Sequence, residues 1–172
     1  TPLKDRIGSQ ILTHYPRNLT DGIKITTQEA IENRDGDREL RIPYFFREII
    51  EQVAMEARKS EFVDQKSGVS VRMTVTSLEN LISNAERRAI KNQEKIITPR
   101  ICDLHAALPA ITGKIELVYE GEQEGEINVS KALIGKAVKS IFKNYFADPL
   151  ASMKRGEKIY TDVVTWFKSN RA

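Results

Sequence analysis

Apolar residues recur at spacings of three and four along three long stretches of this 172-residue chain. That spacing places them on one face of an α-helix, so each stretch predicts an amphipathic helix with one side to bury. Residues 42–59 and 131–146 are two of these stretches, and the third begins near Ser70 and continues through "SLENLISNAERRA". Three such helices predict a mainly α-helical fold.

Each predicted helix has a recognisable start and a defined apolar face. Pro43 suits the first position of its helix, and Ser130 suits an N-cap because its hydroxyl can accept from a free backbone N–H. The expected buried faces are Phe46, Ile49, Ile50, Val53 and Ala57 in the first helix, Leu78, Leu81, Ile82, Ala85 and Ala89 in the second, and Leu133, Ile134, Ala137, Val138, Ile141, Phe142 and Tyr145 in the third.

Shorter elements are expected around these helices. Residues 7–15 have the composition of a strand that closes at Pro16, and Thr27 suits the cap of a short helix ahead of a break at 35–37. Residues 114–120 predict a small β element before the C-terminal helices, followed by an acidic, glycine-broken loop. A last helix is expected over 157–168.

A further helix is expected after the Thr98-Pro99 pair, a common helix opening. Its apolar side would hold Ile101, Leu104, His105 and Leu108, and Pro109 would bend or end it.

Composition limits the compartment and the partners. The formal net charge is only +3, so the whole chain does not demand a polyanionic partner. Cys102 is the single cysteine, which excludes an internal disulfide framework and suits a reducing compartment. The sequence shows neither a secretory signal pattern nor an apolar stretch of membrane-spanning length. We therefore expect a cytoplasmic protein without a membrane segment.

Self-contained catalytic chemistry is not apparent in the sequence. Neither Gly-Lys pair lies in the Gly-x-x-x-x-Gly-Lys-Ser/Thr pattern that cradles a nucleotide phosphate. Cys102, Asp103 and His105 are spaced for metal binding, but they lack the further ligands that zinc requires, so a structural role is favoured. His14 is likewise interpreted as structural, because no nucleophile pattern accompanies it.

A basic stretch, "ERRAIKNQEK" at 86–95, raises the alternative of a nucleic-acid-binding or protein-interaction helical domain. Glu86 and Glu94 interrupt its charge and no aromatic side chain is interleaved, so a solvated helix face is the better interpretation. Nucleic acid is therefore not the expected partner.

Arg72 is placed against a general electrostatic preference. It lies in the first turn of the helix that begins near Ser70, where the helix dipole favours an anion over a cation by about 0.3–1 kcal/mol. One interpretation is a surface residue or a local ion pair, for example with Asp64. The other is implied by the family resemblance described next, in which the arginine faces the phosphate of a nucleotide bound at the helix N-terminus.

Several segments together resemble AAA+ ATPases of the magnesium-chelatase and MoxR-like type. "TPLKDRIGSQILTHYP" is similar to the family segment in which Leu-x-Asp-Arg-Phe precedes a strand ending in Tyr-Pro; Leu3, Asp5 and Arg6 match, and Ile7 replaces the Phe. "GVSVR" at 68–72 resembles the Gly-x-Ser-x-Arg turn of the sensor-2 helix, and "ITP" at 97–99 resembles the opening of the next lid helix. The resemblance covers residues 1 to about 112.

The resemblance implies roles for three residues. Arg72 matches the sensor-2 arginine, which faces the bound nucleotide, and Ser70, in the same turn, is expected to bind the nucleotide with it. Arg6 matches the arginine finger, which reaches the nucleotide of a neighbouring subunit; a surface pair with Asp5 is the alternative. ATP and Mg²⁺ would be cofactors of the full-length parent, and the partners would be other copies in a ring and a von Willebrand A-type subunit.

The resemblance also implies a division of the chain. Residues 1–40 would be the end of an AAA+ core, residues 41–112 a helical lid, and residues 113–172 a strand-plus-helices extension. The phosphate loop and the magnesium ligands of such an ATPase lie upstream of the position matching Thr1. This chain alone is therefore expected to be inactive toward ATP.

Overall fold

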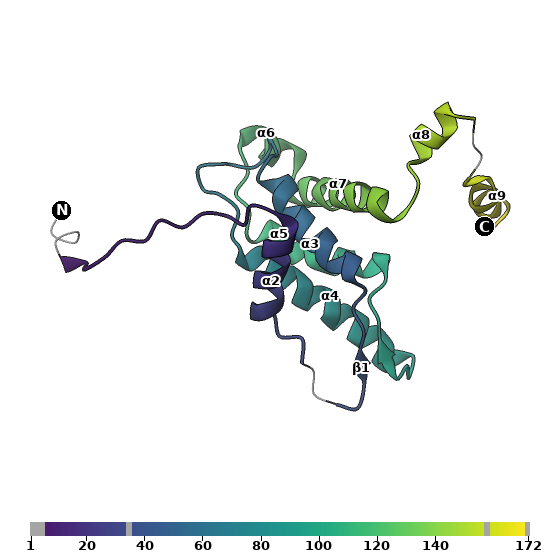
Figure 1. Cartoon of the computed structure of the whole chain (residues 1–172), viewed down its shortest axis with the longest axis horizontal. Coiled ribbons are helices and arrows are strands. Elements are labelled where there is room, and N and C mark those ends of the chain that lie inside the picture. The colour runs from purple at the N-terminus through teal and green to yellow at the C-terminus, as the bar shows by residue number, and fades with distance from the viewer. Residues whose placement is uncertain (1–5, 34–35, 157–158, 171–172) are drawn as a thin grey trace.

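The computed structural model describes residues 6–33, 36–156 and 159–170, and these are mainly helical, as expected (Figure 1). The elements, in chain order, are α2 (Leu19–Glu29), β1 (Glu39–Leu40), α3 (Tyr44–Ala57), α4 (Arg72–Lys91), β2 (Ile96–Ile97), the 3₁₀ helix η1 (Ile101–Ala107), α5 (Leu108–Thr112), α6 (Tyr119–Glu124), α7 (Glu126–Tyr145), α8 (Pro149–Lys154) and α9 (Thr161–Ser169). None of the helices in the described residues is both long enough and apolar enough to cross a bilayer.

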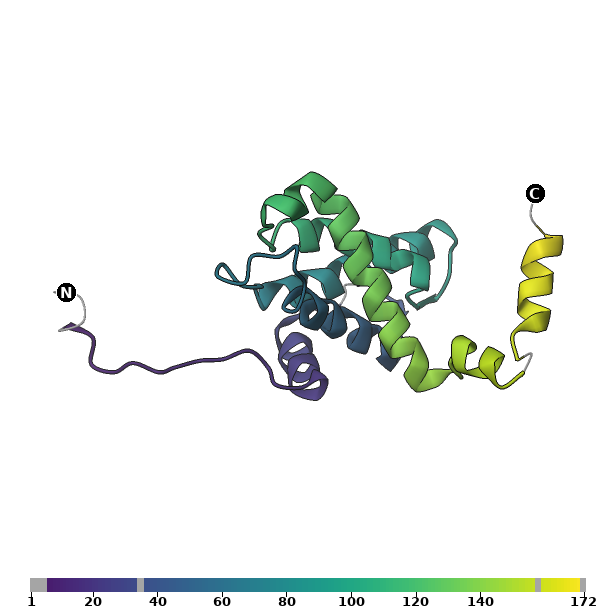
Figure 2. The same ribbon diagram turned by 90° about the horizontal axis from the view of Figure 1, so that it is seen from above.

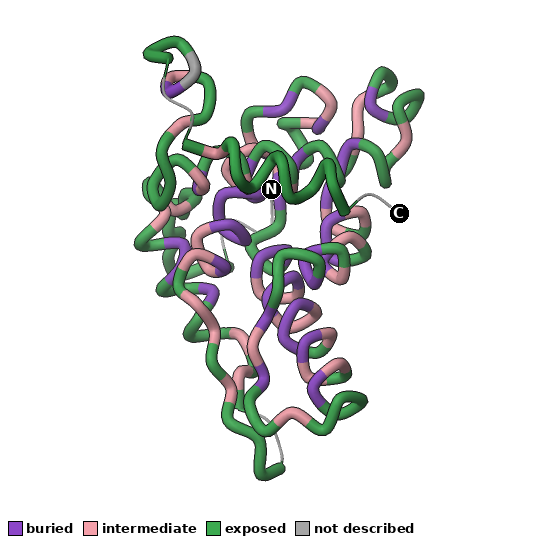
Figure 3. Tube along the Cα trace, turned by 90° about the vertical axis from the view of Figure 1, so that its right-hand side faces the viewer, coloured by how far each residue is buried: buried purple, intermediate pink, exposed green. Residues whose placement is uncertain are grey.

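The hydrophobic core lies among α3, α4 and α7. The apolar faces predicted for α3 and α4 are confirmed, because all ten of those side chains are buried. The colouring of Figure 3 shows the buried positions gathered toward the middle of the helical body. Pro43 is the N-cap of α3 rather than its first helical residue, which begins the helix one position later than expected.

Helix α7 packs along α3 and closes the core (Figure 2). Val129, Leu133, Ala137 and Ile141 recur every four residues and are buried in the same cluster as the α3 side chains. Tyr145, at the exposed end of the helix, donates its hydroxyl hydrogen to Glu48, and this hydrogen bond raises the pKa of Tyr145 to about 12. Residues on both sides of the expected boundary at 112/113 therefore share one hydrophobic cluster.

Ser130 is not the N-cap that the sequence suggested. It lies inside α7 and is fully buried, because the helix begins at Glu126, immediately after Gly125. Gly125 has a φ of 89°, a conformation that glycine adopts without a side-chain clash, and this residue separates α6 from α7. The acidic stretch predicted to be a loop is thus the short helix α6 followed by the first turn of α7.

Residues 7–15 are exposed and form no strand, which corrects the expected N-terminal strand. A strand needs a neighbour to accept and donate its backbone hydrogen bonds, and no described strand lies beside this segment. The helix expected after Thr27 was wrong in position, because α2 ends at Glu29 and Thr27 lies in its last turn rather than at its cap. The cap is Asn18, whose side chain accepts from the Asp21 N–H.

The β structure is smaller than expected and lies elsewhere. β1 and β2 form a two-stranded parallel sheet in which Glu39 pairs with Ile96 and Leu40 with Ile97. The predicted element at 114–120 contributes only two isolated antiparallel bridges, Val69 with Ile115 and Val63 with Leu117. Each bridge nevertheless joins the loop after α3 to the segment before α6.

The helix expected after Thr98-Pro99 is a 3₁₀ helix. Its threefold repeat keeps Ile101 and Leu104 on one side of the helix and takes His105 off that side. Leu104 is buried, but Ile101 and His105 are exposed, so the shared apolar side was wrong. Pro109 lies at the start of α5, after the 3₁₀ turn has ended.

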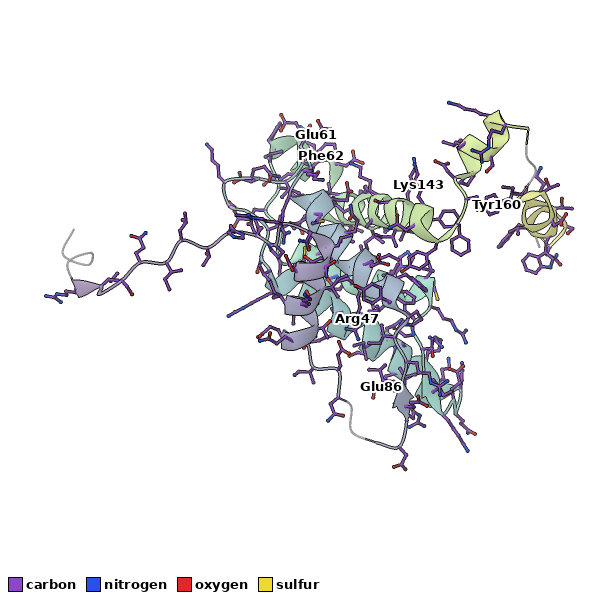
Figure 4. All side chains as sticks on the ribbon, in the orientation of Figure 1. Arg47, Glu61, Phe62, Glu86, Lys143 and Tyr160 are labelled. Atoms are coloured by element: carbon purple, nitrogen blue, oxygen red, sulfur yellow. The ribbon has the colours of Figure 1, made fainter. Side chains whose placement is uncertain are left out.

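Both ends of the described chain extend from the helical body (Figures 1 and 2). The last expected helix is present as α9, with α8 before it, and α9 buries none of its residues. Lys143 and Tyr160, labelled in Figure 4, lie around the junction. There Lys143 pairs with Asp148 at 3.1 Å and Tyr160 donates to the Ala147 carbonyl at 2.7 Å.

Candidate functional site

The turn at residues 68–72 places Arg72 at the first position of the 20-residue helix α4. The Ser70 hydroxyl oxygen accepts from the Arg72 N–H at 3.2 Å, and the Ser70 carbonyl accepts from the Met73 N–H at 3.0 Å. The predicted helix start near Ser70 is therefore confirmed. Both Ser70 and Arg72 are exposed, so the helix N-terminus is open to solvent.

The guanidinium of Arg72 makes no hydrogen bond or ion pair with the residues that the structure describes. The carboxylate of Asp64, its suggested local partner, instead accepts from the Lys66 N–H and from the Ser67 hydroxyl, both at 2.9 Å. These bonds, the Lys66 one foremost, lower the pKa of Asp64. A local ion pair therefore does not explain why this cation lies at a helix N-terminus.

The turn forms one side of an open cleft with a volume of about 400 Å³. Ser67, Ser70 and Tyr15 line the cleft on one side, and Lys114 and Glu116 contribute from the segment before α6. The two sides are joined by the Val69–Ile115 bridge and by a hydrogen bond from the Asp64 N–H to the Glu116 carbonyl at 2.8 Å. The cleft is therefore built on a braced loop.

A buried polar cluster supports the first turn of α4 from beneath. The hydroxyl oxygens of Thr74 and Thr26 lie 2.7 Å apart, and Thr26 donates to the Glu51 carboxylate at 3.2 Å. Burial raises the pKa of Glu51, although the charge of Arg58 opposes this shift. Gly22 makes room for the carboxylate, because a Cβ at that position would overlap it. The cluster joins α2, α3 and α4 directly below the turn.

Arg6 lies at the start of the described chain, in the exposed segment that leads to α2. Leu3 and Asp5, the other matched residues of its motif, lie outside the described residues. The segment extends away from the helices (Figures 1 and 2), and no described contact joins Arg6 to the Ser70–Arg72 turn. The structure therefore does not bring Arg6 and Arg72 together within one chain.

Asp103, one of the three residues considered for a metal, is occupied by other contacts. It is buried and accepts from Asn84 at 2.7 Å, from the Arg100 N–H at 2.7 Å and from Arg88 at 2.9 Å. His105 instead contacts the Cys102 carbonyl, and Cys102 is exposed and free. The described residues contain no group of three or more His, Cys, Asp or Glu side chains arranged to hold a metal.

The basic stretch at 86–95 is partly used for internal contacts. Arg88 contacts Asp103 and Glu94, and Arg87 donates to Asn84 at 2.8 Å. His14, the other isolated histidine, is exposed and lies 2.8 Å from the Tyr15 carbonyl through its Nδ1.

Sequence reasoning did not identify Tyr15, Arg58 and Glu51 as neighbours of this turn. Tyr15 was assigned to the end of a strand, whereas its hydroxyl contacts Val69 in the structure. Glu51 is buried in α3, but its helical neighbours three and four residues earlier are Glu48 and Arg47, so no local pattern in the sequence indicated this burial.

No family model, curated protein or solved structure matches this chain.

Proposed function

We propose that this chain is the helical lid and C-terminal extension of an AAA+ ATPase of the magnesium-chelatase or MoxR-like type. In this proposal Arg72 is the sensor-2 residue, which contacts nucleotide phosphate from the lid. Arg6 is an arginine finger that acts on the nucleotide of a neighbouring copy in a ring. The chain would couple the nucleotide state of the parent protein to remodelling of a partner.

The observation that carries the proposal is the placement of Arg72. An exposed guanidinium with no described partner stands at the first residue of a long helix, whose N-terminus is open to solvent. That placement is unfavourable for a cation alone but becomes favourable beside a phosphate, which accepts hydrogen bonds from the guanidinium. Lys114 lines the cleft beside this turn and is a second cation of the kind that phosphate binds, whereas Glu116 brings a negative charge to the same cleft and Arg72 is not among the residues that line it.

The residues present fit a nucleotide phosphate and leave the rest of the chemistry to the parent. ATP and Mg²⁺ would be held chiefly by a phosphate loop and acidic side chains upstream of Thr1. Within this chain, Arg72 would stabilise phosphate charge, and Ser70 would fix the turn through its bond to the Arg72 N–H. Other copies of the parent and a von Willebrand A-type subunit are the proposed partners, in the cytoplasm.

The test uses the full-length parent protein with Arg72→Ala and Arg6→Ala. Arg6→Ala should leave ATP binding nearly intact and slow hydrolysis by a factor that approaches ~10³, the lower end of the range for arginine fingers. Arg72→Ala should weaken ATP binding as well as turnover, because its contact exists in the ground state too. Arg72→Lys should rescue only part of this loss, since an ammonium lacks the planar fork of a guanidinium.

Two controls make the test specific. Arg87→Ala removes an exposed arginine from the same helix, away from its N-terminus, and should leave ATP binding and hydrolysis unchanged. Mixing Arg6→Ala with a phosphate-loop mutant should restore part of the activity, because some interfaces then pair an intact pocket with an intact finger. Normal hydrolysis by both alanine variants, with folding confirmed by circular dichroism, would contradict the proposal.

A further inference from the structure

The segment of residues 6–16, which we call the arm, is almost entirely surrounded by solvent. Ile11 and Leu12 are 84% and 92% exposed, although both are large apolar side chains. In the described part of the chain, the hydrogen bonds and ring contacts between the arm and the helical body all involve Tyr15. The position of the arm therefore depends on this one side chain.

Tyr15 makes two directed contacts and fits into a space left by a glycine. Its hydroxyl oxygen accepts from the Val69 N–H at 2.9 Å, and the guanidinium carbon of Arg58 lies 4.3 Å from the centre of its ring. This distance is typical of a cation–π contact. Gly68 has a φ of 75°, and a Cβ there would overlap the Tyr15 hydroxyl. The sequence Gly-Val before Ser70 thus forms a seat for the ring.

Arg58 favours reversible docking of the Tyr15 ring in this seat. Its Nε and Nη2 atoms are buried without a hydrogen-bond acceptor among the described residues, so the docked ring covers donors that water would otherwise satisfy. Burial lowers the pKa of Arg58, against the opposing charge of Glu51. Release of the ring returns these donors to water, which offsets part of the lost contact. The docked arm is consequently held less firmly than a core residue.

The seat is continuous with the candidate site. Val69, which donates to Tyr15, directly precedes Ser70, and Ser70 accepts from the Arg72 N–H. The Tyr15 ring also lines the same cleft as Ser70. A displacement of the ring therefore acts on the turn that sets the position of Arg72.

We propose that Tyr15 is a positioning residue that latches the arm bearing Arg6 onto the turn bearing Ser70 and Arg72. Movement of the arm, as when Arg6 engages a neighbouring copy, then loosens or tightens the start of α4. The roles of Arg6 and Arg72 toward nucleotide rest on the proposed function. The mechanical connection between arm and turn does not.

The latch is tested by amide hydrogen exchange, measured by NMR on the 172-residue chain without nucleotide. Tyr15→Phe keeps the ring and removes the acceptor, so the Val69 N–H should exchange about fivefold faster, the factor that corresponds to ~1 kcal/mol. The Arg72 and Met73 N–H groups should change little in this variant. Tyr15→Ala removes the ring as well, and these two amides should then exchange faster together with Val69.

Leu12→Ala is the matched control, because it shortens an apolar side chain of the same arm that is almost fully exposed. It should leave all three amides unchanged. Arm mobility gives an independent readout from a nitroxide on Thr13→Cys in a Cys102→Ser background. The label should become more mobile in Tyr15→Ala and remain restricted in Tyr15→Phe.

Each negative result has a distinct meaning. Unchanged label mobility in Tyr15→Ala would show that Tyr15 does not hold the arm, and unchanged Arg72 exchange would show that the arm is not coupled to the turn. Either outcome overturns the inference, whether or not the parent protein hydrolyses ATP. If the exchange changes are observed but the Arg72→Ala variant of the parent protein hydrolyses ATP normally, the proposed function is contradicted and the inference about Tyr15 is not.

Discussion

At the scale of single residues, two buried carboxylates have opposite electrostatic settings. Asp103 and Glu51 are each 2% exposed. Burial alone raises the pKa of Asp103, but hydrogen bonds from Arg88 and from the Arg100 N–H outweigh it and the pKa is lowered. Glu51 has one hydroxyl donor, Thr26, and its pKa is raised. The ionised carboxylate of Asp103 therefore stabilises the fold, whereas that of Glu51 destabilises it.

Asp103→Ala should lower the free energy of unfolding by about 3 kcal/mol, since it removes the buried acceptor that Arg88, Asn84 and the Arg100 N–H share. The melting temperature should fall by roughly 6–12 °C in thermal unfolding followed by circular dichroism. Asp162→Ala, at an exposed position on α9, is the control and should have little effect. A loss no larger than that of the control would mean that the Asp103 network does not stabilise the fold.

Glu51→Gln tests whether the ionised carboxylate of Glu51 destabilises the folded state. Because the folded pKa of Glu51 is raised, the folded state binds its proton more tightly, and this contribution to stability is present below the unfolded pKa of about 4.3. It is lost as the pH rises through the folded value. Urea unfolding should therefore show Glu51→Gln gaining stability relative to wild type between about pH 4 and neutral pH. A difference that is independent of pH would exclude this assignment.

At the scale of elements, periodicity predicted the long helices and α9 but failed for several of the shorter elements. The faces of α3 and α4 follow from spacing because most of their side chains meet a common core, while Ala85 and Ala89 pack in a second cluster with Ile97. η1, α6 and the strands are too short for a repeat to distinguish them. Their form depends on distant partners, as where Phe62, labelled in Figure 4, accepts from the Val118 N–H at 3.1 Å.

Two truncations separate the core helix from the projecting ones. A chain ending at residue 147 loses α8 and α9, of whose described residues Ser152 alone is buried, so its melting temperature should stay within about 2 °C. A chain ending at residue 125 also loses α7, which exposes the apolar face of α3 to water. That shorter chain should lack a cooperative thermal transition in calorimetry. Cooperative unfolding of it would show that α7 is an appendage to the core.

At the scale of the whole molecule, the candidate site depends on contacts between segments that are far apart in sequence. The turn and its helix could be predicted from "GVSVR" and the apolar repeat that follows, because both are local patterns. The seat for Tyr15 could not, since the hydrogen bond to Val69 joins residues 54 positions apart. The cleft likewise needs Lys114 from the segment before α6, which no local pattern places beside Ser70.

The two bridges from residues 115 and 117 to the loop after α3 have a consequence for synthesis on the ribosome. The Ser70–Arg72 turn emerges well before its braces, so α4 can form locally while its starting turn still lacks the Val69–Ile115 and Val63–Leu117 pairings. We expect a nascent chain stalled short of residue 115 to be cleaved readily by protease between residues 60 and 70. A chain stalled after α7 has left the exit tunnel should resist cleavage there.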